Sequence, residues 1–204
     1  MSTIFVLGDI HGCLDKITPL LYRAGLVDRR LAWTGGDATL CLLGDYVDRG
    51  LDSIPVLDLI MRLQREAAGA GGRVLALLGN HDLMLSIVSK VPGALAGTKR
   101  PFRQQWTLNG GIEKDLERLR PEHVAWIDTL PSMMLVAGRL LIHADATFYR
   151  DYGASVDEVN ASITAVIQGG DPAALALLDE RFAQRMAFRN GASAIEAASR
   201  MLQT

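Results

Sequence analysis

Four short stretches of the sequence place polar side chains directly after apolar runs. GDIHGC at 8–13, GDYVDRG at 44–50 and GNHD at 79–82 each follow such a run, and LIHAD at 141–145 ends another. In a protein core, adjacent polar side chains lose their hydration unless partners replace it. These stretches therefore indicate strand ends that face a polar cleft.

The candidate ligands in these stretches are of the types that bind hard or borderline divalent metal ions. They offer carboxylate, imidazole and amide groups, and none of the candidates is a thiolate. One such stretch alone matches many unrelated proteins, but four in order, each at a strand end, argue against coincidence. The candidate site residues are Asp9, His11, Asp45, Asp48, Arg49, Asn80, His81 and His143.

The elements that must position these residues alternate along the first half of the chain. Residues 3–8, 38–44 and 73–79 form apolar, β-branched runs that predict strands, and we expect the first to be buried on both faces. Alternation of strands and helices with short connections indicates βαβ units and a largely parallel sheet, whose carboxyl ends converge on one crevice. Helices are predicted over 15–26, 52–68 and 83–91.

The second half of the chain has a different pattern, which gives the α/β fold class a mixed α+β character. Two apolar runs around Ala137-Gly138 predict a hairpin over 132–145. The chain closes on a predicted helix. Helices are expected over 111–119, 121–130, 156–167, 172–186 and 192–203.

Composition limits the class of protein and its partners. The 204 residues, 49% hydrophobic and 22% charged, suit one soluble globular domain. A net charge of −2 and a pI near 6.1 indicate neither a nucleic-acid nor a membrane partner. The N-terminus lacks a secretory pattern, and Cys13 and Cys41 lie far apart without a CxxC motif, so we expect a cytoplasmic protein.

The motifs GDIHG, GDYVDRG and GNHD, followed by an apolar strand that ends in His143, resemble the signature of calcineurin-like metallophosphoesterases. The likeness covers about residues 3–145 and points to the phosphoprotein phosphatase (serine/threonine phosphatase) branch, whose bacterial members include dinucleoside polyphosphate hydrolases. It implies a single domain over 1–204, built as a four-layer αββα sandwich with two mixed sheets. It also implies two divalent metal ions, Mn²⁺ first, with Fe or Zn as alternatives.

The resemblance also assigns roles to the metal ligands. Asp9 and His11 would hold the first metal, and Asn80 and His143 the second. Asp45 would bridge the two, with a metal-bridging hydroxide as the nucleophile.

Further residues of the same motifs would carry the catalytic steps. His81 would be the general acid, paired with Asp48, and Arg49 would grip the phosphate. Asp82 is interpreted as a support or helix-cap residue. Arg185 is a candidate second phosphate-binding arginine, although a solvated helix face is the preferred interpretation.

The sequence departs from the family pattern in its histidines. The family has a further metal-binding His in a late Gly-His-Thr-like motif, whereas no His follows His143 here, and His123 is expected on the surface of a helix. We favour a chain that stops short of the usual last strands over a second metal held by fewer ligands. Asp145 is expected to bind backbone amides.

The leading hypothesis is a metal-dependent phosphoesterase that acts on phosphomonoesters, in phosphoproteins or in small phosphorylated molecules. A dinucleoside polyphosphate hydrolase is the alternative within the same fold. A degenerate, non-catalytic phosphate-binding protein is the alternative of another class. The missing late His supports that last alternative, and the presence of Asp48, Arg49 and His81 argues against it.

Overall fold

The computed structural model describes residues 2–91, 93, 100–189 and 191–202, and its first half is a parallel βαβ arrangement. All three strands and all three helices predicted there are present, with ends that differ by a few residues. They are β1 (Ile4–Leu7), α1 (Leu14–Arg23), β2 (Thr39–Leu42), α2 (Ser53–Gly69), β3 (Arg73–Ala76) and α3 (Asn80–Lys90).

The second half contains the predicted hairpin among helices. Two elements had not been predicted, α4 and the 3₁₀ turn η1, and the helix expected over 172–186 ends at Phe182. The elements are α4 (Phe102–Leu108), α5 (Glu113–Arg118), α6 (Pro121–Ile127), β4 (Met133–Val136), β5 (Arg139–Ile142), η1 (Phe148–Asp151), α7 (Val156–Gly169), α8 (Pro172–Phe182) and α9 (Gly191–Leu202).

The strands form one parallel sheet and one antiparallel sheet. β1, β2 and β3 pair in parallel in that order, and β4 and β5 form an antiparallel pair. The α/β fold class and the mixture of parallel and antiparallel strands are thus confirmed. Side chains alternate along β2, so that Leu40 and Leu42 join the main core, whereas Cys41 packs with Met134 and Val136 of the hairpin.

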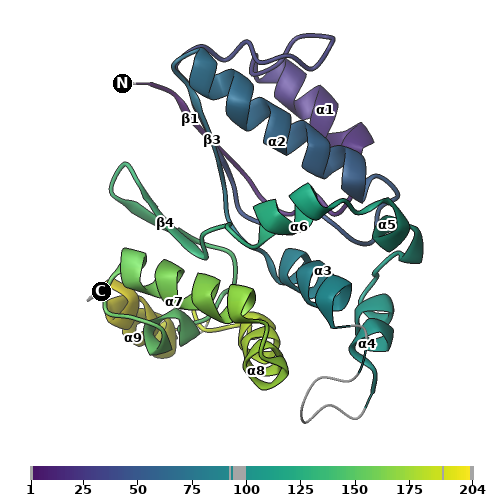
Figure 1. Cartoon of the computed structure of the whole chain (residues 1–204). Coiled ribbons are helices and arrows are strands. Elements are labelled where there is room, and N and C mark those ends of the chain that lie inside the picture. The colour runs from purple at the N-terminus through teal and green to yellow at the C-terminus, as the bar shows by residue number, and fades with distance from the viewer. Residues whose placement is uncertain (1, 92, 94–99, 190, 203–204) are drawn as a thin grey trace.

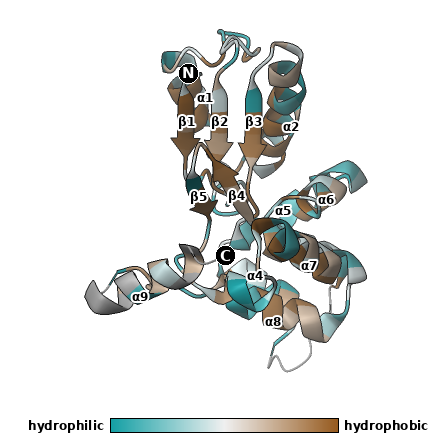
Figure 2. Ribbon diagram, turned by 90° about the vertical axis from the view of Figure 1, so that its left-hand side faces the viewer, coloured by the Kyte–Doolittle hydropathy of each residue, from teal (hydrophilic) through white to brown (hydrophobic). Residues whose placement is uncertain are grey.

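Helices α1 and α2 lie on one face of the parallel sheet, and the hairpin lies on the other (Figure 1). Helix α2 buries Val56, Leu57, Ile60 and Leu63, whose spacing of three to four residues forms one apolar face. Figure 2 shows the carboxyl ends of the three strands pointing together toward the helical part of the molecule. The loops that follow β1, β2 and β3 therefore meet there.

The expectation that residues 3–8 are buried on both faces is wrong. Ile4 is 38% exposed and Val6 is 53% exposed. β1 is one of the two outer strands of its sheet, and the hairpin packs over Cys41 and Leu77 instead. An apolar run reports the composition of a strand, but its place in the sheet decides how much of it is covered.

The hairpin is anchored to the helices by one amide side chain. Asn160 of α7 accepts from the backbone N–H groups of Ser132 and Met133, at 2.9 and 3.0 Å, and donates to the Met133 carbonyl at 3.0 Å. The start of β4 is thereby fixed against α7. No helix in the described part of the chain has the length and hydropathy needed to cross a membrane.

Candidate metal centre

The loops after β1 and β2 bring the first group of candidate ligands together. His11 Nε2 lies 3.7 Å from Asp9 Oδ2 and 3.6 Å from Asp45 Oδ2. The other ring nitrogen, Nδ1, lies 3.0 Å from the Val47 carbonyl oxygen. Because a carbonyl only accepts, Nδ1 carries the proton, and the lone pair of Nε2 faces the two carboxylates.

A second imidazole is oriented in the same way by the end of β5. His143 Nδ1 donates to the Leu43 carbonyl at 2.8 Å, which leaves the lone pair on Nε2. That Nε2 lies 3.4 Å from Asp45 Oδ1 and 3.1 Å from Asn80 Oδ1. His11 and His143 thus approach the two different oxygens of one carboxylate, Asp45.

This donor set fits a pair of divalent metal ions. Carboxylate and amide oxygens with neutral imidazole nitrogens are ligands for Mn²⁺, Fe or Zn. Asp45 has one oxygen toward each imidazole, as a bridging ligand requires. One ligand atom from each of His11, Asp45 and His81 lies within 4.8 Å of the others, so His81 also borders the position of a cation.

The backbone of the loops is strained at the site. His11, Asp45, Asp48 and Arg49 have φ angles of 47°, 55°, 67° and 67°, in the left-handed region that favours glycine. Such conformations cost free energy and persist where surrounding contacts hold them, commonly at functional sites. Gly79 permits the close approach of two loops, because a Cβ there would lie 2.2 Å from the Asp45 nitrogen.

Asp82 supplies contacts that hold these loops. Its buried carboxylate accepts from the backbone N–H groups of Asp45, Tyr46 and Gly79 at 2.8, 2.9 and 3.0 Å. Burial, followed by the neighbouring Asp45 charge, raises the pKa of Asp82, while the amide hydrogen bonds oppose that shift. Asp82 lies at the start of α3 and acts as the support that the sequence predicted.

His81 is held by a buried carboxylate. Its Nδ1 lies 2.7 Å from Asp48 Oδ2, and the side chains are 2% and 0% exposed. Trp106 Nε1 donates to both oxygens of Asp48, at 2.9 and 3.1 Å. No motif in the sequence pointed to Trp106, because the segment of α4 carries none and only packing brings it to Asp48.

Arg49 reaches across the site. Its Nη1 donates to His11 Nε2 at 2.7 Å and its Nη2 donates to His81 Nε2 at 2.8 Å. The backbone N–H of Arg49 donates to the Gly110 carbonyl at 2.7 Å, so the segment after α4 also holds this loop. The lone pair of His11 Nε2 serves one partner at a time, so a metal held there would replace the Arg49 contact.

Arg185 does not lie on a solvated helix face, and that expectation is wrong. Because α8 ends at Phe182, Arg185 falls in the following segment, and its Nη2 donates to Asn80 Oδ1 at 2.7 Å. Asp145 holds the same segment, since its carboxylate accepts from the N–H groups of Met186 and Phe188 at 3.2 and 2.8 Å. The expectation that Asp145 binds backbone amides is confirmed.

His123 is fully buried, which corrects its expected place on the surface. Its Nε2 lies 3.0 Å from Asp58 Oδ1 of α2, and the side chain is 0% exposed. Helix α6 turns this face toward α2, which a single helical segment does not reveal. His123 has its own partner away from the cluster and is not a ligand there.

Asp179 of α8 is a further carboxylate near His81. It is 8% exposed, and it accepts from Gln105 Nε2 at 3.2 Å. Burial raises the pKa of Asp179 to about 6, and the charge of the nearby His81 acts in the opposite direction. α8 therefore borders the cluster of candidate site residues, which its sequence did not indicate.

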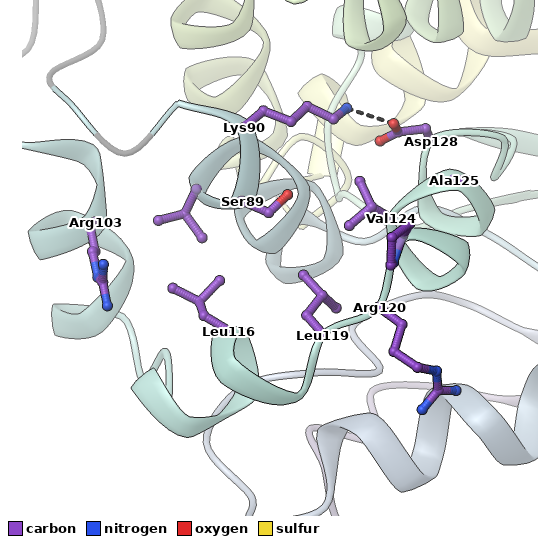
Figure 3. Close-up of a pocket in the computed structure, with 11 residues that line it drawn as sticks. Ser89, Lys90, Arg103, Leu116, Leu119, Arg120, Val124, Ala125 and Asp128 are labelled. Atoms are coloured by element: carbon purple, nitrogen blue, oxygen red, sulfur yellow. Dashed lines mark hydrogen bonds and ion pairs between the residues drawn. The ribbon is translucent and has the colours of Figure 1, made fainter.

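A pocket of about 630 Å³ lies outside this cluster, between α3, α4, α5 and α6 (Figure 3). Leu116, Leu119 and Val124 contribute apolar side chains, and Lys90 forms an ion pair with Asp128 at 2.6 Å. None of the candidate ligands lines it. Its cations, Lys90, Arg103 and Arg120, are each paired with an acidic side chain, so the charge of the pocket does not indicate a ligand.

Known proteins that are similar to this chain are phosphoesterases. The family model of calcineurin-like phosphoesterases matches residues 2–173, and the chain belongs to that family. Over 142 residues it is 32% identical to a symmetrical bis(5'-nucleosyl)-tetraphosphatase of Neisseria gonorrhoeae, covering 69% of this chain and 42% of that protein. Over 81 residues it is 40% identical to Shewanella-like protein phosphatase 2 of Arabidopsis thaliana, covering 40% and 21%.

A solved structure has the same fold over the whole chain. The cold-active protein-tyrosine phosphatase of a psychrophilic Shewanella species superposes with a TM-score of 0.71 at 18% identity, covering 100% of this chain and 63% of that one. At this identity the likeness concerns the fold. The chain spans less than half the length of the two curated relatives above.

Proposed function

We propose that the chain hydrolyses phosphomonoesters at a two-metal centre held by Asp9, His11, Asp45, Asn80 and His143. The observation that carries this proposal is the matched orientation of two imidazoles, each with Nε2 directed at a different oxygen of Asp45. When bound, two divalent cations would lower the pKa of a water molecule and offset the charge of the phosphate.

Two arginines are suited to binding the phosphate. Arg49 has both Nη atoms directed into the cluster, and a planar guanidinium matches the non-bridging phosphate oxygens. Arg185 approaches from the opposite half of the chain, and its Nη1 is fixed by the carbonyls of Phe182 and Gln184 at 2.7 and 2.8 Å. We assign both a positioning role.

His81 is the proposed general acid. Asp48 accepts from Nδ1 and fixes the ring, so that Nε2 faces the cluster, where it accepts from Arg49. When Arg49 binds a phosphate instead, Nε2 is released to hold the proton that it gives to the departing alkoxide. Trp106 fixes the orientation of Asp48 through its bonds to both carboxylate oxygens. This arrangement supports catalysis rather than phosphate binding alone, since a binding protein does not need a proton donor.

Metal analysis combined with turnover of p-nitrophenyl phosphate tests the proposal. We expect Mn²⁺ to bind and to support release of p-nitrophenol, and a chelator to abolish it. Bound metal without turnover of any phosphoester would instead support the non-catalytic phosphate-binding protein.

The same proposal includes the metal, the domain and the compartment. We place Mn²⁺ at the centre and treat the chain as one domain. We assign it to the cytoplasm, where Cys13 and Cys41 stay free.

Hydrolysis of dinucleoside polyphosphates is the second candidate. The 32% identity to a symmetrical bis(5'-nucleosyl)-tetraphosphatase over 69% of this chain supports it. Diadenosine tetraphosphate and a phosphopeptide, offered in parallel at equal concentration, separate the two candidates. Faster hydrolysis of the phosphopeptide supports the first, and faster release of nucleotides supports the second.

A further inference from the structure

A pocket of about 430 Å³ continues from the metal-ligand cluster along helix α1. At one end it is lined by Asp9, His11 and Arg49, so it opens directly on the place proposed for the phosphate. Because it shares these residues with the cluster, the pocket has room for the rest of a molecule whose phosphate is held at Arg49.

The wall formed by α1 is apolar. Ile17 and Leu20 both line the pocket; Ile17 is almost fully covered, whereas Leu20 is 49% exposed and leaves its aliphatic surface uncovered. Exposed apolar surface beside a polar cluster is typical of ligand sites, in which a few polar groups set the orientation. A single hydroxymethyl group, as in phosphoserine, is too small to cover this wall.

A cation lies at the edge of the same pocket. Lys16 is exposed and forms no ion pair with any residue that the structure describes. By contrast, the cations Lys90 and Arg103 that line the 630 Å³ pocket are both paired with acids. Lys16 is therefore available to a negative group on a ligand.

We propose that this pocket binds the leaving group of the substrate, and that it selects an aromatic group bearing a second negative charge. The ring packs on Leu20, the phosphate lies at Arg49, and the second anion pairs with Lys16. This inference rests on the proposed phosphomonoesterase function and adds to it the class of substrate.

Benzyl phosphate and ethyl phosphate provide the test for the apolar wall, since their leaving alcohols have similar basicity. We expect the wild-type chain with Mn²⁺ to prefer benzyl phosphate about tenfold or more in kcat/KM, the range for apolar side-chain discrimination. Leu20→Ser should lower kcat/KM for benzyl phosphate about tenfold more than for ethyl phosphate. Leu177→Ser is the matched control, because Leu177 is 50% exposed on α8.

The second charge is tested with 4-carboxybenzyl phosphate. We expect the wild-type chain to prefer it over benzyl phosphate, and Lys16→Glu to reverse that preference, whereas Lys114→Glu on α5 should leave it unchanged. Salt should reduce the preference, because the pair is exposed.

The outcomes separate the subsite from the function. Equal hydrolysis of benzyl and ethyl phosphate, with equal effects of Leu20→Ser on both, would overturn the subsite while leaving the phosphomonoesterase intact. If neither ester is hydrolysed, the proposed function fails, and calorimetry with benzylphosphonate and ethylphosphonate still decides the subsite. Tighter binding of benzylphosphonate that depends on Leu20 supports it, and equal binding overturns it.

Discussion

The parallel-sheet region and the helical region contribute to one cluster in different ways. Asp9 and Asp45 lie in the loops after β1 and β2, and Asn80 is the first residue of α3, shortly after β3. At each of these places the backbone of the strand sets the direction of the next few residues. Trp106 and Asp179 lie on helices far along the chain, and each reaches the cluster only because its helix packs there.

The two regions are also held differently. In the sheet region, Asp82 alone accepts three backbone hydrogen bonds from the site loops, which keep strained residues in place. In the second half of the chain, Trp106 contacts the cluster through Asp48, and Arg185 contacts it through Asn80. We therefore expect substitutions in the first region to remove metal, and substitutions in the second to change how a bound substrate is processed.

Asp45→Asn should produce the largest effect. The amide keeps the shape and one acceptor oxygen, but the negative charge shared by both metal positions is lost. We expect Mn²⁺ affinity to fall at least about 100-fold, and turnover with it. Calorimetry and metal analysis measure this, with Asp37→Asn, an exposed position, as control. Unchanged metal content in Asp45→Asn would contradict the proposed bridging role of Asp45.

His81→Ala compared with His11→Ala tests the division between acid and ligand. We expect His81→Ala to keep its metal and to lose about 10²–10⁴-fold in turnover of esters with poor leaving groups. His11→Ala should lose metal. Since His81 lies within 4.8 Å of the His11 and Asp45 ligand atoms, equal metal loss in both variants would make His81 a ligand.

Trp106→Phe should affect turnover without affecting metal content. It removes the donor to Asp48, and a hydrogen bond to a charged group contributes about 1.5–3 kcal/mol, so we expect kcat to fall about 10- to 100-fold. The loss should be greater for alkyl esters than for p-nitrophenyl phosphate, whose leaving group needs no proton. Trp126→Phe is the matched control, because Trp126 Nε1 donates to Gln64 at 2.8 Å, away from the cluster.

Mn²⁺ titration should resolve two unequal sites. Asp9, His11 and Asp45 offer two carboxylates, whereas Asp45, Asn80 and His143 offer one carboxylate and a neutral amide. We expect the site at Asp45, Asn80 and His143 to bind Mn²⁺ at least about tenfold more weakly than the other, the usual effect of a weakened ligand set. His123 does not compensate, because it is paired with Asp58. Two equally tight sites in calorimetry would contradict this.

Asp179→Asn should have the smallest effect, and it concerns stability. Burial raises the pKa of Asp179 from 3.8 to about 6, so the folded state holds a proton that the unfolded state releases earlier as pH rises. Stability is therefore lost between about pH 4 and pH 6, and at pH 8 the variant should gain ~1–3 kcal/mol in the free energy of unfolding. Below pH 3.8 the gain should vanish.

Urea unfolding of both proteins at pH 4 and pH 8 measures the effect of Asp179→Asn, with Asp37→Asn as control. A destabilised variant at pH 8 would mean that the ionised carboxylate contributes favourably, most directly through Gln105 at 3.2 Å or through His81.

The sequence by itself determined the parallel sheet and the convergence of its loops. Asp9, Asp45 and Asn80 each follow an apolar run within a few residues, and parallel strands present their carboxyl ends at one edge, so local order alone predicts their meeting. The support role of Asp82 was also local, because Asp82 lies in the first turn of α3, next to the loops it binds.

The tertiary structure decided the rest. Trp106, Arg185 and the burial of His123 depend on which helix packs against which loop, and β1 is exposed because the hairpin covers its neighbours. Such contacts join residues far apart in the chain, and the periodicity of a helix gives its apolar face without naming the partner of that face. Strand ends therefore specify the proposed ligands locally, whereas the contacts of Trp106 and Arg185 with the cluster depend on long-range packing.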